Sequence, residues 1–191
     1  TKQARFWASS YEDKRPELTN AQRKMLSHYD NATLYNDSIV AQIVKRFQKQ
    51  DAIVIYVPDH GEECYEENRG FICRNHSAEI DWPLAHYEFE IPFWIYCSPK
   101  YIRNHRDIYR QIRKAKDKRF MTDALPHLLL YLAGIETPTY KEEYNILSSK
   151  YDEMRPRILK NSADYDKLRD AHLEKIKKEE SKKVKKKERR N

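Results

Sequence analysis

The sequence predicts an α/β fold with a mostly parallel sheet, because helical and strand patterns follow one another directly along the chain. In residues 20–49, apolar side chains recur every three or four positions, which is the period of an amphipathic helix. After a two-residue link, residues 52–57 (Ala-Ile-Val-Ile-Tyr-Val) have the length and the β-branched composition of a buried strand. A helix that leads straight into a strand is typical of a parallel sheet.

Two further segments have clear patterns. Residues 91–97 (Ile-Pro-Phe-Trp-Ile-Tyr-Cys) predict a second apolar strand, with a proline near its start, where a missing N–H does least harm. Residues 122–133 predict a helix with Thr122 as its N-cap and Gly134 just beyond its end. Its leucine-rich face is expected to lie on the sheet.

The remaining segments have weaker patterns. Residues 61–88 are polar and lack a sustained period, so we expect a long loop after the first strand. Residues 100–120 are basic and predict a surface segment or a short helix, and residues 144–147 predict a short strand. From residue 162 onward the pattern is that of a solvated helix that frays. We therefore divide the chain into one domain, residues 1–161, and a basic tail, residues 162–191.

The basic charge is concentrated at the C-terminal end. The formal net charge of the 191 residues is +7, and residues 174–191 contribute +6 of it through ten Lys or Arg and four Glu. A nucleic-acid-binding domain carries its basic face on the folded body, so a nearly neutral body argues against that class. Three glycines are too few for a glycine-rich phosphate loop. The longest apolar run, residues 125–135, is shorter than the roughly 20 residues that a membrane span needs.

Asp59-His60-Gly61 lies just after the first strand, at the edge where open α/β sheets place their functional residues. Neighbouring side chains of a regular strand point to opposite faces, but in a turn opened by Gly61 both can converge on one ion. A carboxylate and a neutral imidazole suit Zn²⁺, and His76 in the following loop can supply another nitrogen. The alternative is a simple turn, in which Asp59 accepts backbone hydrogen bonds and His60 is solvated.

Together these segments resemble the C-terminal half of the sulfatase-like phosphoethanolamine transferases, which belong to the alkaline phosphatase superfamily. The resemblance covers roughly residues 20–160. It rests on motifs that follow one another in order: Tyr29-Asp30-Asn31-Ala32 with Leu34-Tyr35-Asn36-Asp37, Asp59-His60-Gly61-Glu62, His76, Ile91-Pro92-Phe93-Trp94-Ile95, and Thr122-Asp123 with Leu125-Pro126-His127-Leu128-Leu129 and Tyr131-Leu132-Ala133-Gly134-Ile135. It implies a three-layer α/β/α sandwich, in which residues 1–161 are the C-terminal portion of an alkaline-phosphatase-like catalytic domain.

The resemblance also implies a zinc enzyme. By it, Asp59 and His60 are two of the ligands of one or two Zn²⁺ ions, and His76 contacts a second metal or the phosphoryl group. The implied reaction moves phosphoethanolamine from a phospholipid donor to lipid A or another cell-envelope glycan, through a phospho-threonine intermediate. A sulfatase or a phosphodiesterase is the alternative within the superfamily, which shares its metal site.

The family's nucleophilic threonine and its first carboxylate ligand belong to a part of the domain upstream of anything that this chain resembles. Thr1, Thr19 and Thr33 do not lie in a strand-to-helix turn, so no catalytic residue is identified in the chain. We therefore expect a complete zinc site to need residues outside the chain. By itself the chain is expected to bind zinc weakly and to have no transferase activity.

Cys64 and Cys73 support two interpretations. They flank one loop and can pair as a disulfide if the compartment is oxidising, as the periplasm of the implied enzyme is. Alternatively, they form a closed zinc site with His60 and His76 that stabilises a nucleic-acid-binding module, although the spacing matches no zinc-finger pattern closely.

The resemblance places the parent protein in the bacterial inner membrane, with an N-terminal anchor outside this chain and the catalytic domain in the periplasm. The chain alone is expected to be soluble. Its basic tail is either a solvated end or a segment attracted to anionic lipid headgroups, at about 1 kcal/mol per Lys or Arg near the surface at best.

Overall fold

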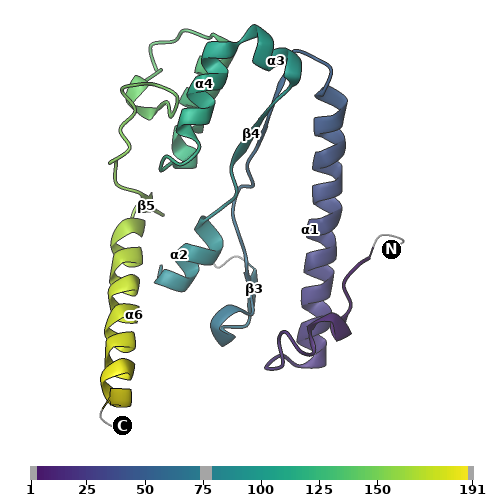
Figure 1. Ribbon diagram of the computed structural model, residues 1–191, viewed down its shortest axis with the longest axis vertical. Coiled ribbons are helices and arrows are strands. Elements are labelled where there is room, and N and C mark those ends of the chain that lie inside the picture. Colours follow the sequence, from purple (N-terminus) through teal and green to yellow (C-terminus); the bar gives the residue numbers. More distant parts are fainter. Residues whose placement is uncertain (1–3, 74–78, 189–191) are drawn as a thin grey trace. The chain divides into compact units, whose positions relative to one another are not determined.

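The long helix predicted near the N-terminus is present as α1, Asn20–Phe47, in the computed structural model of the protein (Figure 1). The structure describes residues 4–73 and 79–188. Thr19 caps α1: its hydroxyl accepts a hydrogen bond from the Gln22 N–H at 3.3 Å, and the Gln22 amide oxygen accepts one from the Thr19 N–H at 2.8 Å. This reciprocal capping box fixes where the helix begins.

The segment before α1 lies beside it (Figure 1) and contains a short 3₁₀ helix, η1, Ala8–Tyr11. The Asn31 side chain accepts a hydrogen bond from the Phe6 N–H at 3.1 Å and donates one to the Phe6 carbonyl at 2.8 Å. The Tyr11 hydroxyl donates to the Asp30 carboxylate. Asp30 and Asn31 therefore hold the N-terminal segment against α1.

Both predicted strands are present, and they pair. β1 spans Ile53–Tyr56 and β4 spans Trp94–Cys97, and together they form a two-stranded sheet. The second strand is shorter than predicted, because Pro92 has no N–H to donate to a ladder and Phe93 instead stacks on Phe120, with 4.9 Å between the ring centroids.

Ser98, which follows β4, is buried and joins three segments. Its hydroxyl donates a hydrogen bond to the Gln50 carbonyl at 2.6 Å and accepts bonds from the N–H groups of Ala52, at 3.4 Å, and Tyr101, at 3.0 Å. A hydroxyl has one donor and two acceptor positions, so Ser98 uses all three. The bond to Tyr101 also caps helix α3, Pro99–Asn104.

The described residues fall into two compact units. One comprises Thr1–Ile55 and Trp94–Arg106, and it holds α1, most of β1, β4 and α3. The other comprises Tyr56–Phe93 and Asp107–Asn191, and it holds the predicted zinc ligands and the remaining elements.

The predicted loop at residues 61–88 contains more regular structure than expected, so that prediction was wrong for part of it. Its elements are β2 (Glu63–Cys64), the 3₁₀ helix η2 (Glu66–Asn68), β3 (Phe71–Cys73), which pairs antiparallel with β2, and α2 (Trp82–Phe89).

Polar contacts define these elements. Arg69 donates to the Asp81 carboxylate at 2.6 Å, and the other Asp81 oxygen caps α2 by accepting the Leu84 N–H at 3.0 Å. The part around β2 and β3 lacks a periodic apolar pattern, and an analysis of periodicity therefore missed it. In α2, by contrast, Trp82, Ala85 and Phe89 are three and four residues apart and belong to an apolar cluster.

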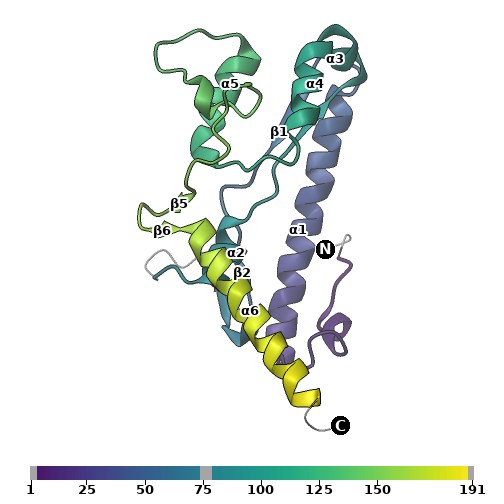
Figure 2. The same ribbon diagram turned by 60° about the vertical axis from the view of Figure 1, so that its left-hand side comes forward.

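The helix predicted from residue 162 onward is confirmed as α6, Tyr165–Glu188, and it packs along α2 (Figure 2). Trp82 of α2 lies stacked on His86, at a centroid distance of 5.4 Å, and on His172 of α6, at 5.2 Å. A buried cluster surrounds this contact, and its members are Ala85, Leu159 and Tyr165, with Ile80, Trp82, Phe89 and Leu168 packed against them.

The second unit contains several other short elements. They are α4 (Arg106–Ala115, which begins at the unit boundary), the 3₁₀ helix η3 (Thr122–Ala124), α5 (Leu125–Ala133), the 3₁₀ helix η4 (Glu142–Tyr144), and the antiparallel hairpin of β5 (Ile158–Leu159) and β6 (Ala163–Asp164).

Two details of these elements differ from prediction. Thr122 makes no side-chain cap for α5, which begins at Leu125, next to Pro126, because a proline fits the first turn of a helix. The strand predicted at residues 144–147 is absent, because the buried Asn145 side chain accepts the Leu147 N–H at 3.1 Å and forms a local turn. Gly134 follows α5 in the left-handed region, as its predicted position requires, with φ of 66°.

Helices and strands are interspersed along the chain, in keeping with the predicted α/β class. The described strands form three two-stranded sheets, of which the β2–β3 and β5–β6 pairs are antiparallel. The mostly parallel sheet, the three-layer sandwich and the division at residue 161 stay predictions. In the part of the chain that the structure describes, no helix combines the length and the apolar character needed to cross a bilayer.

Replacing Ser98 with Ala should destabilise the protein by about 1–3 kcal/mol, because the buried Tyr101 N–H and the part-buried Gln50 carbonyl and Ala52 N–H lose their partner. The free energy of unfolding from urea titration measures this effect. Ser181→Ala is the matched control, since the Ser181 hydroxyl donates to Lys177 on an exposed helical surface. Equal stabilities of the two variants would contradict the role given to Ser98.

Candidate active site

Gly61 fixes the turn that carries the predicted zinc ligands. Its N–H donates to the Glu88 carbonyl at 2.8 Å. A Cβ atom at this position would lie 2.1 Å from the Tyr87 carbonyl oxygen, which is closer than any real contact. Only glycine therefore allows the turn to approach the C-terminal part of α2, and this contact sets the position of the two residues before it.

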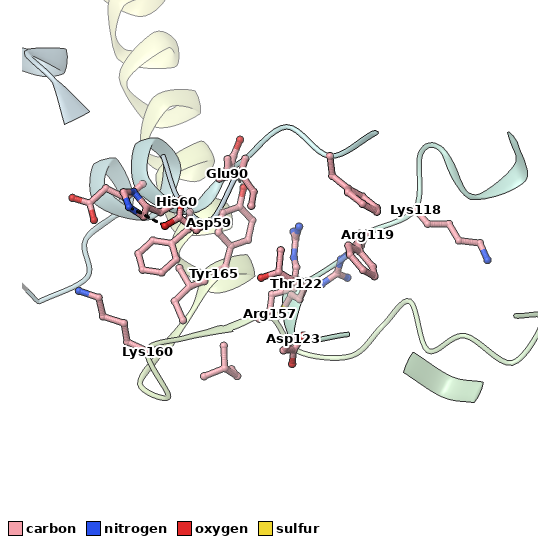
Figure 3. Close-up of a pocket in the computed structure, with 18 of the residues that line it drawn as sticks. Asp59, His60, Glu90, Lys118, Arg119, Thr122, Asp123, Arg157, Lys160 and Tyr165 are labelled. Atoms are coloured by element: carbon pink, nitrogen blue, oxygen red, sulfur yellow. Dashed lines mark hydrogen bonds and ion pairs between the residues drawn. The ribbon is translucent and has the colours of Figure 1, made fainter. Parts of the chain in front are cut away.

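Asp59 and His60 lie together on this turn, and the structure brings their side chains close (Figure 3). The His60 Nε2 is 3.5 Å from the Asp59 Oδ2, and the His60 Nδ1 is 2.8 Å from the Gly61 carbonyl oxygen. A carbonyl only accepts hydrogen bonds, so in the neutral imidazole Nδ1 carries the proton and Nε2 keeps its lone pair. Two ligand atoms of one tetrahedral Zn²⁺ lie about 3.3 Å apart, so the pair fits a shared ion.

These two residues do not by themselves complete a metal site. Within residues 4–73 and 79–188, no group of three or more His, Cys, Asp or Glu side chains converges. His76, the predicted further ligand, lies outside the described residues. The Cys73 side chain is also outside the description, although the β2–β3 register places Glu63 opposite Cys73 and Cys64 opposite Phe71. The Cys64–Cys73 disulfide thus stays a prediction.

Asp59 and His60 line a pocket with a volume of about 720 Å³, which lies entirely in the second unit (Figure 3). Its lining carries five cations from several segments, Lys116, Lys118, Arg119, Arg157 and Lys160, and four carboxylates, Asp59, Glu88, Glu90 and Asp123. Figure 3 shows Asp59 and His60 near Tyr165 and Glu90, whereas Lys118 lies at the other end. The pocket thus combines a candidate metal pair with a basic wall.

Three guanidinium groups surround the Asp166 carboxylate at the start of α6. Arg157 donates two hydrogen bonds to it, at 2.6 and 3.2 Å, Arg119 donates another, and Arg169 lies 3.1 Å away. The bonds from Arg157 hold the pKa of Asp166 below its usual value, against the opposing effect of partial burial. Arg169 also pairs with Asp170 at 2.8 Å, so two carboxylates face three guanidinium groups and this cluster keeps a net positive charge.

A second polar cluster lies at the end of the pocket that holds Asp59 and His60 (Figure 3). The Tyr165 hydroxyl donates to the Glu90 carboxylate, and the His86 Nδ1 lies 2.9 Å from the same oxygen. Partial burial alone would raise the pKa of Glu90, but these contacts outweigh it and lower the pKa. Glu90 is therefore an anion held in place by its neighbours.

The basic wall was not predicted from the sequence. Residues 116–119 were expected only to belong to a basic surface segment, and Arg157 and Lys160 had no signal. The hairpin of β5 and β6 carries Lys160 in a left-handed conformation, with φ of 48°, at the pocket edge. These residues are far apart in sequence, and only the tertiary fold brings them to Asp59 and His60.

An Asp-His pair at the edge of a cation-rich pocket is an arrangement suited to phosphate or sulfate esters. The chain matches the sulfatase family over residues 4–135 and belongs to that family.

Its relatives include phosphoethanolamine transferases. Phosphoethanolamine transferase EptC of Escherichia coli O18:K1:H7 is 30% identical over 141 residues, which cover 72% of this chain and 23% of that protein. The Kdo(2)-lipid A phosphoethanolamine 7''-transferase of Escherichia coli K12 is 31% identical over 99 residues, covering 50% of this chain and 16% of that protein. The resemblance inferred from the motifs is thereby confirmed.

Solved structures of phosphoethanolamine transferases are also similar to this chain. The C-terminal periplasmic domain of EptC from Escherichia coli is similar at a TM-score of 0.63 and 28% identity, covering 79% of this chain and 43% of that domain. The same domain in complex with Zn gives the same TM-score and identity. The chain therefore spans less than a quarter of the length of these curated relatives and less than half of the solved domain.

Replacing Gly61 with Ala should destabilise the protein by about 2–4 kcal/mol, because the added carbon must displace the backbone of α2. Gly134→Ala is the control: at φ of 66° with open space around it, it should cost only about 1 kcal/mol. Chemical denaturation of both variants gives the comparison. The contact assigned to Gly61 is refuted if its variant is no less stable than that of Gly134.

Proposed function

We propose that the chain is part of a zinc-dependent enzyme that transfers phosphoethanolamine from a phospholipid to lipid A or another cell-envelope glycan. The observation that carries this proposal is the placement of His60 Nε2 and Asp59 Oδ2 at 3.5 Å on the rim of a basic pocket. The names of the relatives and the zinc complex of the E. coli domain support it.

Asp59 and His60 are proposed to hold one Zn²⁺ in this enzyme, with further ligands from outside the described residues. The Asp59 side chain is 85% exposed and that of His60 is 25% exposed, so both are open to an incoming ion. The bond from Nδ1 to the Gly61 carbonyl orients the ring and makes Nε2 the better ligand. The ion, when bound, lowers the pKa of the nucleophile and neutralises charge on the phosphoryl oxygens.

His76 is proposed to contact a second ion or the phosphoryl group, on the strength of the family motif. The number of zinc ions, one or two, follows from that assignment. The nucleophile is proposed to be a threonine outside this chain.

The cations of the pocket are proposed to bind the phosphate groups of the donor or the acceptor. Arg157 and Arg119 are planar donors held by Asp166, which makes them preorganised for phosphate oxygens. Lys160, at the tip of the β5–β6 hairpin, is an exposed ammonium at the edge nearest His60 in Figure 3. Binding to this wall places a phosphoryl group beside the zinc ligands.

Zinc affinity tests the metal assignment. Asp59→Ala and His60→Ala should each weaken zinc binding at least about tenfold, because each removes a ligand. Competition with a chromophoric chelator measures the affinity of the 191-residue chain. Asp37→Ala and His28→Ala, both on exposed positions of α1, should leave it unchanged.

The same zinc-binding measurement distinguishes the proposed enzyme site from a structural zinc site. If Cys64→Ser and Cys73→Ser abolish zinc binding and Asp59→Ala does not, the metal belongs to a cysteine site. The transferase assignment would then fail.

The parent enzyme is proposed to act in the periplasm at the inner membrane, and the basic part of α6 to contact its anionic headgroups. Leu173 and Ile176 are exposed on α6 beside the lysines of its second half. An exposed helix with apolar residues and many lysines suits a lipid surface.

Removal of residues 174–191 should reduce co-sedimentation with phosphatidylglycerol vesicles, because it removes a net charge of +6. Phosphatidylcholine vesicles are the control, and binding to the anionic vesicles should fall at high salt. Equal sedimentation of the two proteins rules out a membrane role for the tail.

A further inference from the structure

A second cavity, with a volume of about 440 Å³, lies in the same unit as the pocket of Asp59 and His60. Residues of α4, α5 and the segment around η4 line it, and Lys118 lines both hollows. In Figure 3 the Lys118 ammonium points away from Asp59 and His60. The two hollows therefore share one side chain but face different parts of the unit.

The polar groups of this cavity are mainly hydrogen-bond donors. The Tyr131 hydroxyl donates to the Gln111 amide oxygen at 2.8 Å, which leaves the Gln111 NH₂ group available. The Tyr140 hydroxyl oxygen accepts from the Asn145 amide at 2.9 Å, so the Tyr140 proton remains available to a ligand. Asn145 is fully buried, and its orientation is fixed by its bond to the Leu147 N–H.

The charge of the cavity is positive. Lys118 donates to the Ile146 carbonyl at 3.2 Å, and an ammonium group has two further protons to donate. Lys114 adds a second ammonium at an exposed position. The carboxylate on this side, Glu142, is paired with Lys150 at 2.6 Å. A ligand that matches these groups is rich in oxygen acceptors and carries negative charge.

We propose that this cavity binds a phosphorylated saccharide and serves as a second subsite for the acceptor of the transferase. Lys114 and Lys118 contact the phosphate, and the amide and hydroxyl donors contact the sugar oxygens. The cavity has the size of a small-molecule site and is much larger than a bare phosphate ion. The role as an acceptor subsite rests on the proposed function, whereas binding itself needs neither zinc nor the nucleophile.

Calorimetric titration of the 191-residue chain in the presence of a chelator tests this proposal. Glucosamine 6-phosphate should bind more tightly than glucosamine or inorganic phosphate. Lys114→Gln should weaken its binding roughly tenfold, through loss of a charge-assisted hydrogen bond. Tyr140→Phe should weaken it severalfold, since the ring remains and only the hydroxyl is lost. Lys24→Gln, which removes the same charge from an exposed position on α1, should have no effect.

Several results would overturn the proposal. Inorganic phosphate binding as tightly as the sugar phosphate would show a simple anion site. Equal losses in Lys114→Gln and Lys24→Gln would show a non-specific charge effect. Phosphatidylglycerol vesicles that lose binding in Lys114→Gln, without binding of the sugar phosphate, would assign the cavity to a lipid headgroup.

The test of the cavity can succeed or fail independently of the test of the zinc site. If sugar phosphate binding depends on Lys114 but zinc binding does not depend on Asp59 and His60, the cavity is a binding site and the transferase assignment fails. The reverse pattern would keep the transferase and reject the subsite.

Discussion

The contact between Gly61 and α2 is the constraint on which the candidate site depends. One backbone hydrogen bond, from the Gly61 N–H to the Glu88 carbonyl, joins the turn after β1 to the end of a helix. No side chain fits between them. The geometry of Asp59 and His60 is thus set by main-chain packing, which is stiffer than a network of side chains. Functional side chains are positioned most precisely on rigid elements of this kind.

Ion pairs around Asp166 hold the arginine side chains of the pocket wall in place. Asp166 stands at the start of α6 and gathers Arg119, Arg157 and Arg169. Arg157 also lies over the Tyr165 ring, at 4.3 Å from its centroid. The first turn of α6 is therefore part of the pocket wall, whereas its second half carries the lysines. A single helix joins a structured site to a basic end.

The sequence predicted what depends on local pattern. The apolar period of α1 and the β-branched run of β1 were sufficient to locate both elements, and the Asp-His-Gly turn could be placed because it follows that strand. The hairpin of β2 and β3 was missed, because polar contacts such as that of Arg69 with Asp81 hold its surroundings. The strand predicted at residues 144–147 failed because one buried amide, Asn145, bends the chain. No periodicity encodes such a bond.

The site was predictable only in part for the same reason. Asp59 and His60 are adjacent, so their proximity is local. Lys160 and Arg157 reach the pocket from about a hundred residues away, and their arrival depends on the β5–β6 hairpin and on the packing of α6 along α2. Cation-rich walls of this kind leave no spacing rule in a sequence. The motif resemblance supplied what the pattern could not, namely the family.

Lys118 can couple the binding of anions in the two cavities. Its ammonium borders both hollows, so an anion that engages it from one side alters the field felt by an anion on the other. Thermodynamic linkage requires that the two effects be equal: whatever factor the first ligand imposes on the second, the second imposes on the first. One side chain can thereby make the occupancies of two cavities interdependent without any movement of the backbone.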